Sequence, residues 1–210
     1  MLEMRNKYAF WGVVLYIASS NYLIYYLLLS QNGIEDLKVK IWVSLYWLTM
    51  MFASINAVAR SFNQESKAQQ LYFYTIVNPR DLIISKMLYN FLFIVVLSLI
   101  SLFFFILFLG NPIHNMGFFI LTIITGATAY SFLFTMISGI AAKADNNGTL
   151  SAILGFPIVL PLIIYITKVS REAFSPSLSD DCWLNFGILV GFNILLFTLA
   201  LILYPFVWRD

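Results

Sequence analysis

The sequence predicts an all-α membrane protein with six transmembrane helices. Of its 210 residues, 61% are hydrophobic and 10% are charged, whereas soluble domains carry about 45–50% apolar and about 25% charged residues. Six stretches contain no Asp, Glu, Lys, Arg or His, and each has the ~17–25 residues that a helix needs to cross a bilayer. These predicted spans are residues 8–29, 41–59, 87–109, 116–142, 149–167 and 182–208.

The first predicted span is expected to stay in the mature protein. Its apolar run is longer than the hydrophobic region of a secretory signal, and no small-residue cleavage pattern follows it. Tyr22, Tyr25 and Tyr26 also place aromatic rings where a headgroup belt is expected. The chain shows no internal repeat or linker, so we expect residues 1–210 to form a single polytopic membrane domain.

The positive-inside rule predicts that both termini lie in the cytoplasm. With that orientation, eight Lys and Arg residues fall on the cytoplasmic side and four fall outside. The cytoplasmic residues are Arg5, Lys7, Arg60, Lys67, Arg80, Lys86, Lys143 and Arg209. The outer residues are Lys38, Lys40, Lys168 and Arg171.

Several chemistries are missing from the predicted spans. None contains an ionisable group of the kind that marks ion pathways in coupled transporters. The G-x-x-x-x-G-K-[ST] phosphate loop is absent, so the chain is not expected to hydrolyse ATP or to act as an enzyme. No metal-binding set is expected, and a net charge of +2 gives no reason to expect nucleic acid. Such a protein must be passive, be a scaffold, or take energy from a partner.

The longest connection, residues 60–86, is predicted to lie on the cytoplasmic side and to contain a short amphipathic helix. Between residues 65 and 76, apolar side chains recur at helical spacing while polar ones fall on other faces. Asn78, Pro79 and Asp81 then predict the start of the next helix, with Asn78 as N-cap, Pro79 at the first helical position and Asp81 completing a capping box.

An in-plane helix joined stiffly to a span can pass a movement from a cytoplasmic ATPase into the membrane. The alternative is an interfacial helix that only anchors two spans. Under the coupling hypothesis, the candidate ATPase contacts are Glu65, Lys67, Gln70, Tyr74, Pro79 and Arg80.

Three stretches resemble the haem exporter protein B family (CcmB), membrane subunits of the ABC-2 class that serve cytochrome c maturation in bacteria. They are FASINAVARSFNQESKAQQLYFYTIVNPRDLIISKMLYN (52–90), GNPIHNMGFFILTIITGATAYS (110–131) and MISGIAAKADNNGTLSAILGFPIVLPLII (136–164). The resemblance covers most of residues 5–166. It implies an ABC-2 type permease in the bacterial inner membrane.

The resemblance also implies partners and a cargo. The expected partners are an ABC ATPase (CcmA-like), a haem-handling membrane protein (CcmC-like), a small single-span subunit (CcmD-like) and a periplasmic haem chaperone (CcmE-like). No cofactor is expected to be bound; haem is the cargo that the resemblance suggests, and ATP is used by the partner subunit. We expect a homodimer or a pseudo-dimer, since ABC transporters need two membrane halves.

Two alternatives to this function come from different classes. One is an ABC-2 permease that exports another substrate, such as a lipid, drug or glycan. The other is a scaffold for cytochrome maturation that transports nothing.

A few further residues carry their own hypotheses. Pro157 and Pro161 lie inside the fifth span, where each removes a backbone donor and kinks or breaks a helix. Such a break marks either a moving region or a static kink. His114 is expected to be a solvated loop side chain, and the alternative is a haem contact.

Small and amide side chains predict close packing between helices. In the fourth span, Gly126, Ala129, Ser138, Gly139 and Ala142 permit neighbouring helices to approach. Four asparagines in spans are expected to form hydrogen bonds between helices or to line a path: Asn21, Asn56, Asn90 and Asn193.

Overall fold

The computed structural model describes residues 7–30, 39–63, 78–143 and 147–209. This part of the chain is helical and contains no strand. Its helices are α1 (Lys7–Ser30), α2 (Val39–Asn63), α4 (Pro79–Leu109), α5 (Met116–Lys143), α6 (Asn147–Glu172) and α7 (Cys182–Arg209). The predicted all-α fold is confirmed for the described residues. The predicted amphipathic helix at 65–76 lies outside them.

Five of the described helices are long and apolar enough to cross a membrane. Their candidate spans are Phe10–Leu28, Val39–Ala59, Arg80–Leu109, Met116–Ala141 and Cys182–Tyr204. The remaining predicted span, residues 149–167, falls within α6, whose side chains are described only from Pro157 onward. That α6 also crosses the membrane therefore stays a prediction from the sequence.

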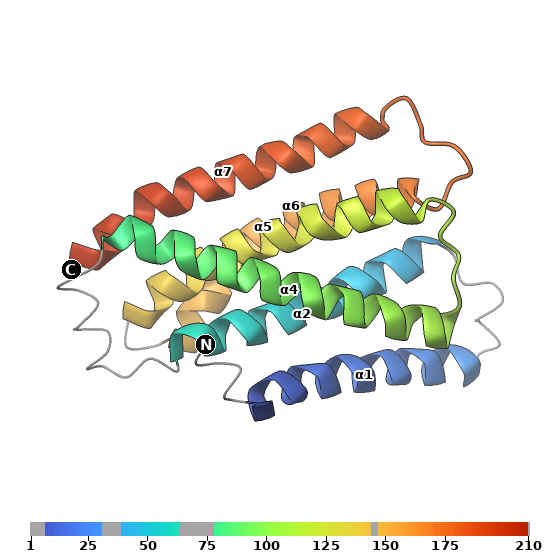
Figure 1. The fold of residues 1–210 in the computed structure, drawn as a ribbon, viewed down its shortest axis with the longest axis horizontal. Coiled ribbons are helices and arrows are strands. Elements are labelled where there is room, and N and C mark those ends of the chain that lie inside the picture. The colour runs from blue at the N-terminus through green and yellow to red at the C-terminus, as the bar shows by residue number, and fades with distance from the viewer. Residues whose placement is uncertain (1–6, 31–38, 64–77, 144–146, 210) are drawn as a thin grey trace.

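The helices run back and forth along one bundle axis, and α5 lies at its centre. Helix α5 packs against α2, α4, α6 and α7, while α1 packs against α4 and α2 at the edge of the bundle. Figure 1 shows α1 and α7 along opposite edges, with the start of α1 and the end of α7 at the same end of the bundle. An even number of helices that alternate in direction places the start of the first helix and the end of the last helix at the same end of the bundle.

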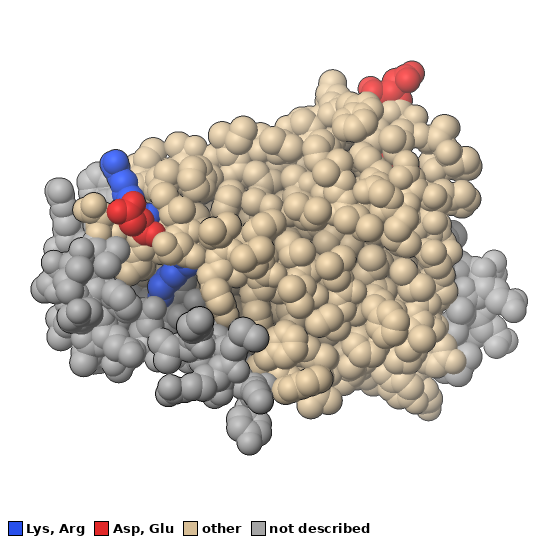
Figure 2. Space-filling view, viewed as in Figure 1, with Lys and Arg blue, Asp and Glu red and all other residues tan. Residues whose placement is uncertain are grey.

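The outer surface is apolar along most of its length. Many large hydrophobic side chains are exposed on it, including Leu92, Phe103 and Ile164, an arrangement that water disfavours and lipid favours. In Figure 2 the described charged side chains lie near the two ends of the molecule, and the surface between them is free of charge on this face. The surface is therefore suited to a bilayer.

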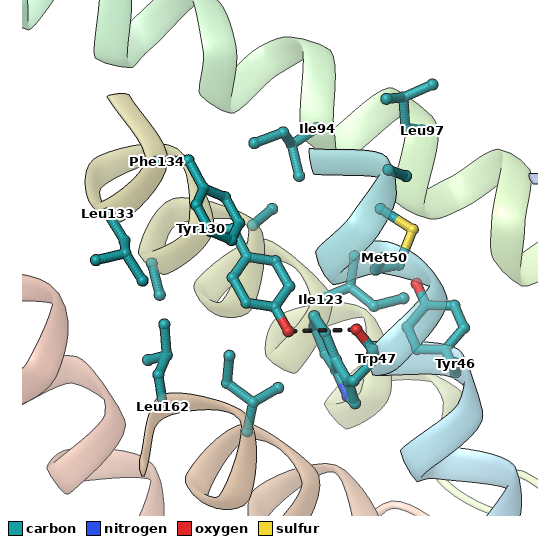
Figure 3. Close-up of a cluster of buried hydrophobic side chains, with 14 of the residues drawn as sticks. Tyr46, Trp47, Met50, Ile94, Leu97, Ile123, Tyr130, Leu133, Phe134 and Leu162 are labelled. Carbon is teal, nitrogen blue, oxygen red and sulfur yellow. Dashed lines mark hydrogen bonds between the residues drawn. The ribbon is translucent and has the colours of Figure 1, made fainter. Parts of the chain in front are cut away.

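Buried aromatic side chains hold the centre together. Trp47 of α2 lies against α5 at Gly126, where an added Cβ would overlap the indole ring. The Trp47 indole nitrogen donates to Ser170 Oγ of α6 at 2.7 Å, and Tyr130 of α5 donates through its hydroxyl to the Trp47 carbonyl at 3.3 Å. Figure 3 shows this cluster and the second of these bonds. Because residue 126 is a glycine, the Trp47 side chain of α2 can pack against α5 and also bond to α6. The small residues of the fourth predicted span indicated such close packing.

Candidate coupling corner at the start of α4

The described part of the candidate coupling element is the start of α4, residues 78–81, which we call the coupling corner. Asn78 takes an extended backbone conformation, with φ −66° and ψ 136°, and Pro79 is the first helical residue. The Asn78 carbonyl accepts from the amides of Asp81 and Leu82 at 3.1 and 3.2 Å. A proline at this position loses no helical bond, because the first amides of a helix have no partner in the helix.

The capping box predicted at this corner is not formed. The Asn78 side chain makes no capping hydrogen bond. The Asp81 amide, which that side chain would need, already donates to the Asn78 carbonyl. Asn78 is therefore the N-cap through its backbone carbonyl and not through its side chain. The sequence predicted the start of the helix correctly, but the side-chain capping bond that it predicted is not formed.

The first turns of α4 are fastened to α5 by two hydrogen bonds. Ser131 Oγ of α5 donates to the Met87 carbonyl at 2.6 Å, and the Asn90 side-chain amide donates to Thr135 Oγ1 at 2.8 Å. All four residues are buried. The two bonds lie about one turn apart on both helices and join α4 to α5 within about three turns of the coupling corner.

The other predicted contact residues divide into two groups. Glu65, Lys67, Gln70 and Tyr74 lie outside the described residues. Arg80 is exposed at the start of α4, as is Asp81. Figure 2 shows basic and acidic atoms at this end of the bundle. The corner therefore presents charged side chains beyond the apolar part of the helix.

The sequence did not single out Ser131 or Thr135 as part of this site. Both are small polar residues in a span rich in such residues, so nothing local distinguishes them. Asn90 was expected to form a bond between helices, and it does. An asparagine in a span was thus the available signal, because its amide needs a partner inside an apolar layer.

The two prolines of α6 do not divide it. The helix is continuous over Asn147–Glu172 with Pro157 and Pro161 inside it, and both side chains are exposed. A ring on the outer face does not collide with a neighbouring helix, and spans tolerate the missing backbone donors through local adjustment. The helix is therefore not interrupted at these positions, and the kink that the sequence also predicted there stays a prediction.

The connection at residues 110–115, which the sequence predicts to lie outside, contacts the end of α6. The backbone amides of His114 and Asn115 both donate to the Ala173 carbonyl, at 3.1 and 2.8 Å. The His114 side chain is exposed. Among the described residues, no three His, Cys, Asp or Glu side chains gather as a metal site.

Long apolar helices in alternation, with charges near the ends, define a multi-pass α-helical membrane protein. A family model described as CcmB protein matches residues 27–208. The chain therefore belongs to the CcmB family, as the sequence motifs suggested, and is a membrane component of the haem export and cytochrome c maturation system. No curated protein and no solved structure matches it.

Proposed function

We propose that the chain is the permease subunit of an ABC transporter that delivers haem and releases a haem-loaded chaperone during cytochrome c maturation. The observation that carries this proposal is the family match over residues 27–208. The chain lacks a phosphate loop, so the energy comes from a separate ABC ATPase subunit. A haem-handling membrane protein, a small single-span subunit and a periplasmic haem chaperone complete the complex.

The coupling corner supports a route for that energy. The ATPase contacts the cytoplasmic connection through Glu65, Lys67, Gln70, Tyr74 and Arg80, and Pro79 holds the angle at which α4 begins. Movement at the corner then reaches α5 through the Ser131–Met87 and Asn90–Thr135 bonds. Two copies of the chain, or one copy and a related subunit, form the two membrane halves around two ATP sites.

The test is reconstitution of the purified chain with its ATPase, the other membrane subunits and the haem chaperone. We expect release of haem-loaded chaperone to require both this chain and ATP hydrolysis, and the chain alone to show no ATPase activity. Release of the chaperone without this chain would favour export of another substrate. Failure to recover any ATPase with the chain would favour the scaffold.

A further inference from the structure

An exposed asparagine lies within the candidate span of α2. Asn56 falls inside Val39–Ala59, and its side chain makes one hydrogen bond among the described residues, from Nδ2 to the Phe52 carbonyl at 2.9 Å. One amide hydrogen and the Oδ1 atom therefore still need a partner. The exposed hydroxyls of Ser19 and Thr198 differ, because each donates its single hydrogen within its own helix. Hydrocarbon offers neither donor nor acceptor, whereas asparagines in spans bond across helices.

The outer side of α6 has an acceptor that matches this donor. Pro157 and Pro161 are both exposed on it. Because Pro161 has no amide hydrogen, the Pro157 carbonyl lacks the donor that a helix normally provides four residues further on. Residues four apart lie on one face of a helix, so this carbonyl lies on the exposed face as well. In a span, such a backbone group is tolerated where a neighbouring helix or water covers it.

The bond between Trp47 and Ser170 shows that these polar groups lie at one level. It joins α2 to α6, which run in opposite directions (Figure 1). Asn56 comes nine residues after Trp47, and Pro161 comes nine residues before Ser170. Both are therefore displaced by about 14 Å toward the same end of the bundle. Nine residues are also two and a half turns, so each lies on the side of its helix away from the bond.

Large apolar side chains occupy the same outer surface of the two helices. They are Leu48, Phe52 and Ile55 of α2 and Leu160 and Ile164 of α6, and they are 37–61% exposed. Together with Asn56, Pro157 and Pro161, these residues form what we call the α2–α6 face. The face has an apolar middle, a donor at the edge away from α6 and an acceptor at the edge away from α2.

We propose that the α2–α6 face is the surface through which two copies of the chain bind each other in the membrane. A two-fold axis along the membrane normal leaves every level unchanged and exchanges the two edges of the face. Asn56 of each copy then lies opposite the proline edge of the other copy, where its free amide hydrogen donates to the Pro157 carbonyl. A second copy thus supplies both missing partners at the right depth, which lipid tails cannot do. The inference rests on the proposed function, which needs two membrane halves, and it identifies the face that joins them.

Cross-linking in native membranes that contain the whole complex tests this contact. On the background Cys182→Ala, we expect Ile164→Cys to give a covalent dimer of the chain with a short membrane-permeant bis-maleimide. Leu92→Cys is the matched control, because Leu92 is 58% exposed and Ile164 is 61% exposed, but Leu92 lies on α4, outside the α2–α6 face. No dimer from Ile164→Cys, an equal yield from both variants, or an adduct of Ile164→Cys with a different subunit would each overturn the proposal.

Removal of the donor gives a second test. With two differently tagged copies expressed together, we expect Asn56→Leu to reduce recovery of one copy with the other several-fold. Ser19→Leu is the control, since Ser19 is also exposed in a candidate span and bonds to its own helix. Unchanged recovery for Asn56→Leu, or an equal loss for both variants, would contradict the role of Asn56.

The outcome is separable from that of the proposed function. Cross-linking and co-recovery report only on contact between two copies, whereas reconstitution reports on release of the haem-loaded chaperone. Release without a dimer through Ile164→Cys would refute the α2–α6 contact and leave the permease role intact. A dimer through this face without release would support the contact and refute the proposed function.

Discussion

At the scale of single residues, the four asparagines that the sequence analysis named fall into three kinds. Asn90 bonds to a side chain of a neighbouring helix, and Asn193 donates both to the Thr125 carbonyl of α5 and within its own helix. Asn56 donates only within its own helix and is exposed. Asn21 has no hydrogen-bond partner among the described residues. Four asparagines that look alike in the sequence thus have three different roles, because the neighbouring helix decides what each can reach.

Gly126 gives the sharpest prediction at this scale. We expect Gly126→Ala to destabilise the protein by about 1–3 kcal/mol, the usual cost of forcing extra volume into a packed core. The added methyl group would overlap the Trp47 ring and disturb its bond to Ser170. The measurement is the free energy of unfolding in detergent, followed by tryptophan fluorescence.

Gly191→Ala is the matched control for this prediction. It also adds a methyl group to a glycine in a span, but a Cβ there meets nothing within 4 Å. We expect it to leave stability unchanged or slightly raised, because alanine favours a helix more than glycine does. Equal destabilisation by both substitutions would refute the close contact between Trp47 and Gly126.

At the scale of elements, helix positions could be predicted but helix faces could not. The start of α4 at Pro79 was expected from the turn chemistry, and the starts of α5 and α7 coincide with the edges of charge-free runs. Helix α6 continues to Glu172, beyond the charge-free run, because backbone hydrogen bonding does not stop where charges begin. The bond from Trp47 to Ser170 spans 123 residues of sequence. A helix that is apolar on all sides has no periodic sequence pattern that would show which of its faces meets which neighbouring helix.

The link between α4 and α5 can be tested by removing its donors. We expect Ser131→Ala and Asn90→Leu to lower the yield of haem-loaded chaperone per ATP hydrolysed, because the start of α4 would move without α5. The matched control is Ser98→Ala, since Ser98 is also buried in α4 but its hydroxyl bonds within its own helix, to Ile94. The measurement is chaperone release and ATP hydrolysis in the reconstituted complex. A control that uncouples as strongly as Ser131→Ala would contradict the link.

The coupling corner itself makes a different prediction. We expect Arg80→Glu to weaken ATPase association, since Arg80 is exposed beyond the apolar part of α4, and Pro79→Gly to retain hydrolysis but reduce chaperone release. The anchoring alternative predicts no effect of polar changes. It predicts misfolding from Leu71→Asp, because Leu71 lies on the apolar face predicted for the helix at residues 65–76. Recovery of the ATPase with the chain and the yield of c-type cytochrome distinguish the two. Normal values for Arg80→Glu would leave the coupling role without support.

At the scale of the whole molecule, the arrangement of the helices leaves two possible orientations of the protein in the membrane. The start of α1 and the end of α7 lie at the same end of the bundle, which agrees with the prediction that both termini lie on one side of the membrane. The start of α4, the end of α5 and the start of α6 lie at that end too, and the connection between α6 and α7 lies at the opposite end. The bias of eight to four among the Lys and Arg residues predicts that this end, with both termini, faces the cytoplasm.

Cysteine accessibility decides between the two cases. Cys182 is the single cysteine and is buried, so Cys182→Ala gives a background without thiols. On that background, we expect cysteines at positions 36 and 175 to react with a membrane-impermeant maleimide in intact cells. Cysteines at positions 66 and 145 should react only after the membrane is permeabilised, because the positive-inside rule puts them in the cytoplasm. The opposite pattern at all four positions would invert the protein and place the coupling corner out of reach of any cytoplasmic ATPase.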